Sequence, residues 1–267
     1  MLNRKTVQIA GRPYPYADEG SGPLLVLIHG FCGSADYWDQ VIPLLSSQFR
    51  CIAPDLRAHS GSFAPQGPYA INDLAQDIHE LLNQLDAPPV VMLGHSLGGY
   101  TTLAFAEAYP ERLKGFGLIH STAYPDSEEA KNNRLLAMES IRHDGLEAYV
   151  DQLIPKLFAE AHVQPMAEQL DTAIQIGYGT DSEGAVATLE AMRGRPDRNS
   201  IIADAKVPVL LAAGDQDRIV PLEKALSVTE EHVRHAVLHN CGHMSMYENP
   251  KQISEIIQQF AIHCFSR

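Results

Sequence analysis

The amino-acid sequence predicts an α/β fold in which a mostly parallel sheet is flanked by helices. Two observations indicate this fold. Short apolar runs alternate with helical periodicity up to about residue 120 and again after residue 200, and a Gly-x-Ser-x-Gly pentapeptide separates one such run from the helix after it. Strands that alternate with helices imply a parallel sheet with right-handed crossovers. In such sheets the ligand-binding and catalytic residues lie at the carboxyl ends of the strands.

The first half of the chain supplies most of the predicted sheet. Strand patterns at 6–9 and 14–17, with a turn at 11–13, predict an antiparallel hairpin at a sheet edge. The unbroken apolar run at 24–28 is typical of a strand covered on both faces. Further strands are expected at 50–54, 90–93 and 115–120, and helices at 37–47, 72–85 and about 97–109.

From about residue 122 to residue 200 the alternation stops. This stretch contains only helical patterns, at about 127–143, 146–160, 165–176 and 182–193, and Asp126 or Ser127 is expected to cap the first. Strands resume at 207–214 and 235–238, before a helix over 250–265. The sequence therefore predicts a core domain of residues 1–121 and 201–267. The insertion, residues 122–200, is expected to form an all-helical cap, or lid, over the site.

The pentapeptide Gly94-His95-Ser96-Leu97-Gly98 is typical of a nucleophile elbow. A strand that turns directly into a helix strains the backbone at the turn, and side chains two positions away would collide there. Glycines at 94 and 98 remove those side chains. Ser96 then stands exposed at the end of the strand as a candidate nucleophile, although the pentapeptide alone also fits an ordinary glycine-rich turn.

A serine nucleophile needs a base and a carboxylate that orients it, and both are expected at later strand ends. Asp215 and Asp217 follow the strand at 207–214; we prefer Asp217, deeper in a loop closed by Pro221, and expect Asp215 to cap the turn. Of His239 and His243, we prefer His243, because it lies in a glycine-containing loop beyond the strand.

The oxyanion hole needs two backbone amides. Leu97 follows the nucleophile, and Phe31 follows the neighbouring strand in the stretch His29-Gly30-Phe31, so these two residues are the candidates. His29 is expected to brace its loop by hydrogen bonding.

Five motifs in order along the chain resemble those of the α/β-hydrolase superfamily, in its bacterial carboxylesterase-like branch with a helical cap. They are His29-Gly30-Phe31, Asp55-Leu56-Arg57-Ala58-His59-Ser60, Gly94-His95-Ser96-Leu97-Gly98-Gly99, Gly214-Asp215-Gln216-Asp217 with Pro221, and Gly242-His243-Met244. The resemblance implies the α/β-hydrolase fold and a Ser96, Asp217, His243 triad. Members often have glycine where this chain has Ala58 and Ser60, a departure that can stiffen or reshape the loop.

The resemblance implies a carboxylesterase-like serine hydrolase that works through an acyl-enzyme, and the apolar residues of the predicted cap favour esters of small to medium apolar acyl groups. Haloalkane dehalogenases and epoxide hydrolases of the superfamily use an aspartate nucleophile, and plant hydroxynitrile lyases carry lysine after the histidine, where this chain has Met244. Lactone, thioester or carbon–carbon hydrolysis, cofactor-free perhydrolysis, acyl transfer and a slow ligand sensor stay open. No cofactor or metal is expected.

The substrate should contact the cap, where Leu135, Met138, Leu153 and Phe158 are candidates for an acyl pocket. No cationic cluster is obvious, and Arg193, Arg195 and Arg198 are expected in a solvated hinge between cap and core.

The net charge of −13 argues against a nucleic-acid partner. The sequence has no apolar run long enough to span a membrane, no signal-peptide pattern at its start and four scattered cysteines without a metal motif, so we expect a cytoplasmic protein. The expected partner is a small-molecule ester, and the oligomeric state is not predicted.

Overall fold

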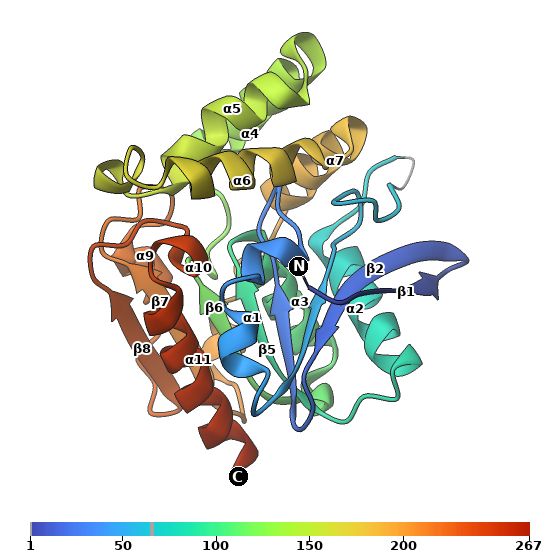
Figure 1. Cartoon of the computed structure of the whole chain (residues 1–267), viewed down its shortest axis with the longest axis vertical. Helices are drawn as coiled ribbons and strands as arrows, with labels where there is room; N and C mark the ends of the chain where they lie inside the picture. The colour runs from blue at the N-terminus through green and yellow to red at the C-terminus, as the bar shows by residue number, and fades with distance from the viewer. Residues whose placement is uncertain (1, 65–66) are drawn as a thin grey trace.

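The computed structural model describes residues 2–64 and 67–267. Met1, which the predicted core domain includes, lies outside the described residues. The apolar runs form an eight-stranded sheet in the order β1-β2-β4-β3-β5-β6-β7-β8, which confirms the predicted fold (Figure 1). The strands are β1 (Arg4–Ile9), β2 (Arg12–Glu19), β3 (Leu24–Ile28), β4 (Arg50–Pro54), β5 (Val90–His95), β6 (Leu113–Ile119), β7 (Val209–Gly214) and β8 (Val233–Leu238). The pairings β1–β2 and β2–β4 are antiparallel, and all the others are parallel.

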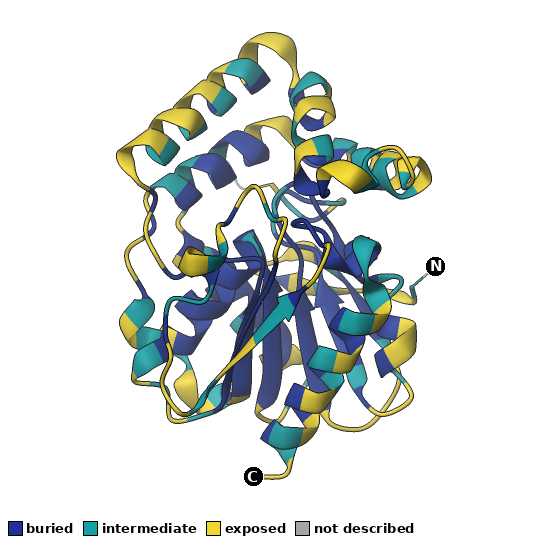
Figure 2. Ribbon diagram, turned by 90° about the vertical axis from the view of Figure 1, so that its left-hand side faces the viewer, coloured by how far each residue is buried: buried dark blue, intermediate teal, exposed yellow. Residues whose placement is uncertain are grey.

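Helices cover both faces of the sheet. Helices α1 (Ile42–Leu45) and α11 (Pro250–Phe265) lie on one face, and α2 (Ile71–Gln84) and α3 (Leu97–Ala108) lie on the other (Figure 1). Every residue of β3 and β5 is buried as a result, which explains why these strands are unbroken apolar runs. Figure 2 shows the sheet as a dark blue layer between helices whose outer faces are exposed.

The segment of residues 122–200, all of it described, contains helices and no strand. Helices α4 (Glu128–Asp144), α5 (Leu146–Leu157), α6 (Ala167–Tyr178) and α7 (Ser182–Arg193) lie above the carboxyl ends of the parallel strands (Figure 1). Ser127 caps α4, because its side chain accepts a hydrogen bond from the amide of Ala130. These helices therefore lie over the residues that follow the parallel strands.

Two local predictions were wrong, and three short helices were not predicted. The helix expected over 37–47 is a 3₁₀ turn, η1 (Ala35–Trp38), followed by the short α1, which begins next to Pro43 because proline fits the first turn of a helix. The hairpin turns at Ala10 and Gly11, both at positive φ, so that Arg12 and Pro13 belong to β2. Three helices of four or five residues were missed, too short to show a period: α8 (Asn199–Ala203), α9 (Leu222–Ala225) and α10 (Ser245–Glu248).

The loop after β4 has left-handed backbone at the two positions where glycine is usual. Ala58 has a φ of 66° and Ser60 a φ of 47°. The loop also contacts the helical segment, because the amide of Ser60 donates to Gly179 O and that of Asp181 donates to Ala58 O. These contacts hold two non-glycine residues in a conformation that costs each about 1–2 kcal/mol.

Replacing Ser60 by glycine is expected to raise the free energy of unfolding by about 0.5–1 kcal/mol, because relief of left-handed strain exceeds the entropy cost of glycine. Ser46→Gly is the matched control. Ser46 has a φ of −66°, so the same replacement there should lower that free energy instead. Urea unfolding of both variants measures the difference, and a loss of stability in Ser60→Gly would contradict the strain argument.

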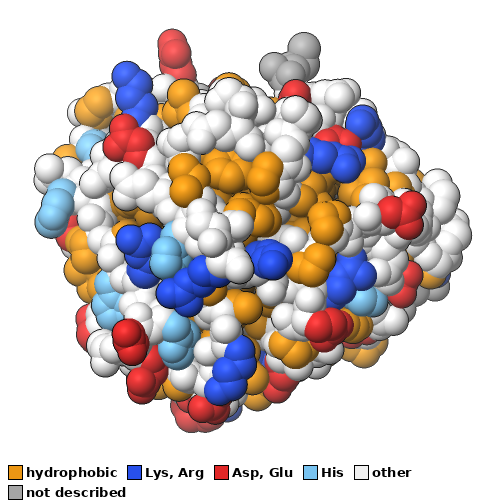
Figure 3. Space-filling view, turned by 90° about the horizontal axis from the view of Figure 1, so that it is seen from below, with side chains coloured by type: hydrophobic (Ala, Val, Ile, Leu, Met, Phe, Trp, Pro, Cys, Tyr) orange, Lys and Arg blue, Asp and Glu red, His pale blue; other side chains and the backbone are white. Residues whose placement is uncertain are grey.

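The surface away from the helical segment mixes charges. Figure 3 shows basic, acidic and hydrophobic side chains interspersed on this face, with several basic groups near its centre. None of the described helices combines the length and the apolar character that crossing a membrane requires.

Candidate active site

Ser96 lies in the sharp turn between β5 and α3. Its φ of 51° and ψ of −112° are strained for a residue with a side chain. A Cβ on Gly94 would lie 2.0 Å from the carbonyl oxygen of Gly98, and one on Gly98 would lie 2.4 Å from that of Ile28. Side chains at either position would therefore push the turn apart. Ser121 Oγ donates to the carbonyl oxygen of Ser96 at 2.8 Å and holds the turn from β6.

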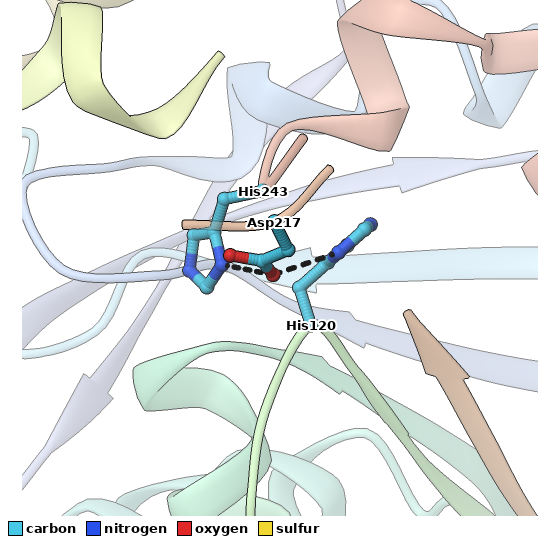
Figure 4. Close-up of side chains that lie close together, drawn as sticks. All are labelled: His120, Asp217 and His243. Atoms are coloured by element: carbon cyan, nitrogen blue, oxygen red, sulfur yellow. Dashed lines mark hydrogen bonds and ion pairs between the residues drawn. The ribbon is translucent and has the colours of Figure 1, made fainter. Parts of the chain in front are cut away.

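Asp217 and His243 meet at the carboxyl ends of β7 and β8. His243 Nδ1 lies 2.7 Å from Asp217 Oδ2, and both side chains are buried (Figure 4). The other carboxylate oxygen, Oδ1, accepts hydrogen bonds from the amides of Ile219 and Val220 at 2.8 and 3.0 Å. Burial acts to raise the pKa of Asp217, but the charge of His243 and the histidine hydrogen bonds outweigh it and hold that pKa well below its usual range. Asp217 is therefore an ionised acceptor that can orient the imidazole.

The competing pair, Asp215 and His239, lies outside this arrangement. His239 Nδ1 is 3.0 Å from Asp215 Oδ2, and the His239 side chain is 76% exposed. Asp215 Oδ1 also accepts from the amide of Cys241 at 3.4 Å, which is the turn-bracing contact expected of it.

The candidate oxyanion donors are the amides of Leu97, which directly follows Ser96, and of Phe31, which follows Gly30 in the loop after β3. Within the described residues neither amide donates a backbone or side-chain hydrogen bond. Gly30 packs so tightly here that a Cβ on it would lie 2.6 Å from His95 Nδ1 and 3.3 Å from Ser96 Cβ. The loop after β3 therefore passes directly beside Ser96, and two free donors are available for a developing oxyanion.

Two buried groups hold the loop that carries His243. His95 Nε2 lies 2.8 Å from the carbonyl oxygen of His243. The carboxylate of Glu248 accepts hydrogen bonds from the amides of Gly242, Met244 and Ala159 at 2.9–3.1 Å. Because Ala159 follows α5, Glu248 ties the helical segment to the His243 loop. Sequence reasoning missed Glu248, since its partners are amides that no sequence pattern identifies.

Sequence reasoning also missed His120, which comes from the end of β6. Its Nδ1 lies 3.2 Å from Asp217 Oδ2 (Figure 4), and the Gly214 amide donates to the same nitrogen at 3.2 Å. Burial lowers the pKa of His120, so the ring is neutral. His120 therefore lies between a backbone donor and an ionised acceptor. Its place at the end of a predicted strand was the available signal.

His120, Asp217 and His243 each offer a possible metal-ligand atom, and these atoms lie within 4.8 Å of one another. The same atoms already form the hydrogen bonds of the acid–base pair. A metal-bound histidine usually donates its other ring N–H to an acceptor, whereas His120 Nε2 has no partner among the described residues. The three side chains therefore fit a hydrogen-bonded network better than a metal site.

A cavity of about 90 Å³ opens beside Ser96 and His243. Its other lining residues are Phe31, His95, Tyr100, Arg134, Tyr149, Leu153, Leu157, Met192 and Ile219. Of the four predicted pocket residues, only Leu153 is among them. Leu135 and Met138 line a different hollow, which is bordered by α4, α7 and residues 64, 67 and 68. Phe158 is fully buried and stacks on Tyr247, with ring centroids 6.2 Å apart.

The prediction of a solvated arginine hinge was wrong for two of its three members. Arg195 and Arg198 have side chains only 5% and 4% exposed. Arg195 lies over the ring of Tyr100 and pairs with Asp126, and Arg198 pairs with Glu107. Their partners come from distant parts of the chain, so sequence proximity suggested a hinge where folding makes buried pairs.

His29 and His59 brace the loops next to the site, as expected for His29. His29 Nδ1 lies 2.7 Å from the carbonyl oxygen of Gly30, and its Nε2 accepts from the amide of Leu56 at 3.0 Å. His59 Nε2 accepts from the amide of Cys32 at 3.2 Å, so this ring must be neutral. Burial lowers the pKa of His59 to about 4.

Stability is expected to fall on acidification because of His59. Its pKa is about 4 when folded and 6.5 ordinarily, so below pH 6.5 the unfolded chain binds a proton that the folded chain does not. This contribution to the free energy of unfolding is complete above pH 6.5 and is lost as the pH falls toward 4. The loss at pH 5 is about 2 kcal/mol.

Urea unfolding at pH 7 and pH 5 tests this expectation. His59→Gln should show a smaller difference between the two pH values than the wild type, whereas replacement of the exposed His239 by glutamine should retain the wild-type difference. Equal pH dependence in His59→Gln and the wild type would contradict it.

The chain belongs to the alpha/beta hydrolase fold family, whose sequence model matches residues 23–250. A 2-(acetamidomethylene)succinate hydrolase of Mesorhizobium japonicum is 29% identical over 76% of this chain and 74% of its own length. A 3-oxoadipate enol-lactonase of Acinetobacter baylyi is 24% identical over 95% and 94%. The structure of a thermophilic esterase from Thermogutta terrifontis, with malate bound, has a TM-score of 0.91 and 29% identity and covers 98% and 99% of the two chains. The family and these relatives together show that the protein is a hydrolase.

Proposed function

We propose that the protein is a serine hydrolase that cleaves carboxylic esters through Ser96, His243 and Asp217. The observation that carries the proposal is the 2.7 Å contact between a buried, ionised Asp217 and His243, which lines the same cavity as the strained Ser96. The sequence predicts small to medium acyl groups. A cavity of about 90 Å³ favours the small end of that range, since typical ligand pockets measure roughly 300–1,000 Å³.

The mechanism follows from the positions of the groups. His243 takes the proton of Ser96 Oγ as this oxygen attacks the ester carbonyl, and Asp217 keeps the imidazole proton on Nδ1. The amides of Phe31 and Leu97 donate to the oxyanion that forms. His243 then protonates the leaving alcohol, and it activates the water that cleaves the acyl-enzyme and frees Ser96.

In this proposal residues 122–200 are the lid, and residues 1–121 and 201–267 are the core. Support comes from Tyr149, Leu153 and Leu157 of α5, which line the Ser96 cavity together with core residues. The amide of His243 also donates to the carbonyl oxygen of Leu157 at 2.7 Å, so the end of α5 contacts the base directly. A shift of α5 would change both the pocket and the base.

A lactone is the second candidate substrate. The similarity to an enol-lactonase runs along 95% of this chain and favours it. A lactone is an internal ester, so the same groups would open it with the alcohol retained on the product.

Hydrolysis of p-nitrophenyl esters from acetate to laurate tests the proposal. We expect steady turnover that is fastest for the shortest acyl groups, because the cavity is small. Folded protein without turnover of any ester or lactone would refute a hydrolase of this type.

A further inference from the structure

Two arginines share one buried carboxylate beside the Ser96 cavity. Arg134 Nε lies 2.6 Å from Asp126 Oδ2, and Arg195 Nη1 lies 2.6 Å from Asp126 Oδ1. The Asp126 and Arg195 side chains are 4% and 5% exposed. Although burial acts to raise the pKa of Asp126, the two arginines outweigh it and lower that pKa. The cluster therefore holds two positive charges and one negative charge.

Arg134 presents the surplus charge to the cavity. Among the described residues that line this cavity, it is the one arginine, lysine, aspartate or glutamate. Its bonds to Asp126 use Nε and Nη2, whereas Nη1 has no hydrogen-bond partner in the described parts of the chain. The Arg134 side chain is 23% exposed, so water solvates part of this charge, and a carboxylate bound in the cavity would complete the hydrogen bonding of Nη1.

We propose that Arg134 binds a carboxylate of the substrate, so that the protein acts on short acyl esters or lactones that carry a second, ionised carboxylate. This inference rests on the proposed function, because it places the anion in the cavity of Ser96. A guanidinium recognises a carboxylate through directed, charge-assisted hydrogen bonds. The volume of about 90 Å³ limits the acyl part to a short chain. This proposal differs from the sequence-based expectation of small to medium apolar acyl groups.

The alternative is that Arg134 only neutralises Asp126. Arg195 already pairs with this carboxylate at 2.6 Å, so a second cation is not needed for neutralisation. The two roles differ in outcome. A purely structural Arg134 would affect stability and all substrates equally, whereas a binding Arg134 would affect the anionic substrate selectively.

The experiment compares monomethyl succinate, dimethyl succinate and methyl butyrate as substrates. In the wild type we expect kcat/KM for the anionic ester to exceed that for the neutral esters at least about 10-fold. Arg134→Met should lower the anionic value about 10- to 100-fold, mainly through KM, and leave the neutral values within about 3-fold. Arg142→Met is the matched control, because Arg142 is an exposed residue of the same helix that lies outside this cavity. It should behave as the wild type.

Two additions keep the test decisive. If Arg134→Met does not fold, Arg134→Lys should fold and show an intermediate loss confined to the anionic ester. Calorimetric binding of monomethyl succinate to Ser96→Ala, with and without the Arg134 substitution, separates recognition from turnover. Binding that depends on Arg134 without turnover in the wild type would support the carboxylate site at Arg134 and refute the proposed hydrolysis. Ser96-dependent turnover without preference for the anionic ester, or unchanged by Arg134 substitution, would overturn this inference alone, and absence of both binding and turnover would overturn both.

Discussion

Replacing Ser96 by alanine is expected to lower kcat for p-nitrophenyl acetate by about 10⁶-fold, the loss found when a serine nucleophile of such a triad is removed. The oxygen that attacks the carbonyl is then missing, while the free amides of Phe31 and Leu97 can still polarise the ester. The fold should persist, because alanine fits the elbow as serine does and the Ser96 side chain has no described hydrogen-bond partner that braces the turn.

The measurement is steady-state hydrolysis, combined with mass spectrometry after treatment with a fluorophosphonate. The wild type should gain one covalent adduct on Ser96, and Ser96→Ala should gain none. Ser47→Ala is the control, because Ser47 is an exposed serine between α1 and β4. This variant should keep the wild-type rate and the wild-type adduct. Retention of most activity in Ser96→Ala would show that another group attacks the substrate.

Replacing Asp217 by asparagine is expected to lower kcat by about 10⁴-fold. The carboxylate holds the His243 proton on Nδ1, and an amide in its place can donate to Nδ1 and so stabilise the wrong tautomer. Asp215→Asn is the matched control, since Asp215 contacts the exposed His239 rather than His243. It should change kcat by less than about 3-fold.

Both variants are compared on the same ester across pH 5 to 9. A large loss in Asp215→Asn together with a small loss in Asp217→Asn would reverse the assignment of the acid. Thermal unfolding accompanies the kinetics, because Asp217 Oδ1 also accepts hydrogen bonds from Ile219 and Val220 and some stability loss is expected. A loss of stability without a loss of kcat would mean that Asp217 only holds its loop and does not orient His243.

The sequence alone determined the sheet, the helical segment above it and the positions of the strand ends. It could do so because an apolar run or a helical period is visible in residues that are close together in the sequence. The elbow is equally local. The contacts that Gly94 and Gly98 permit lie within a few residues of Ser96 or against the adjoining strand β3. Asp217 and His243 follow because parallel strands end at one edge, so their chain order implies their proximity.

Only the tertiary structure decided the surroundings of that site. His120, Glu248 and Arg134 each matter through a partner at least eight residues away, such as Asp126 for Arg134 and Ala159 for Glu248. The same holds for Arg195, which looked solvated beside its basic neighbours and is buried against Tyr100. Residue type and spacing carry no record of which distant groups become neighbours. The candidate triad was therefore predictable from the sequence, whereas the charge and volume of the cavity beside Ser96 required the folded chain.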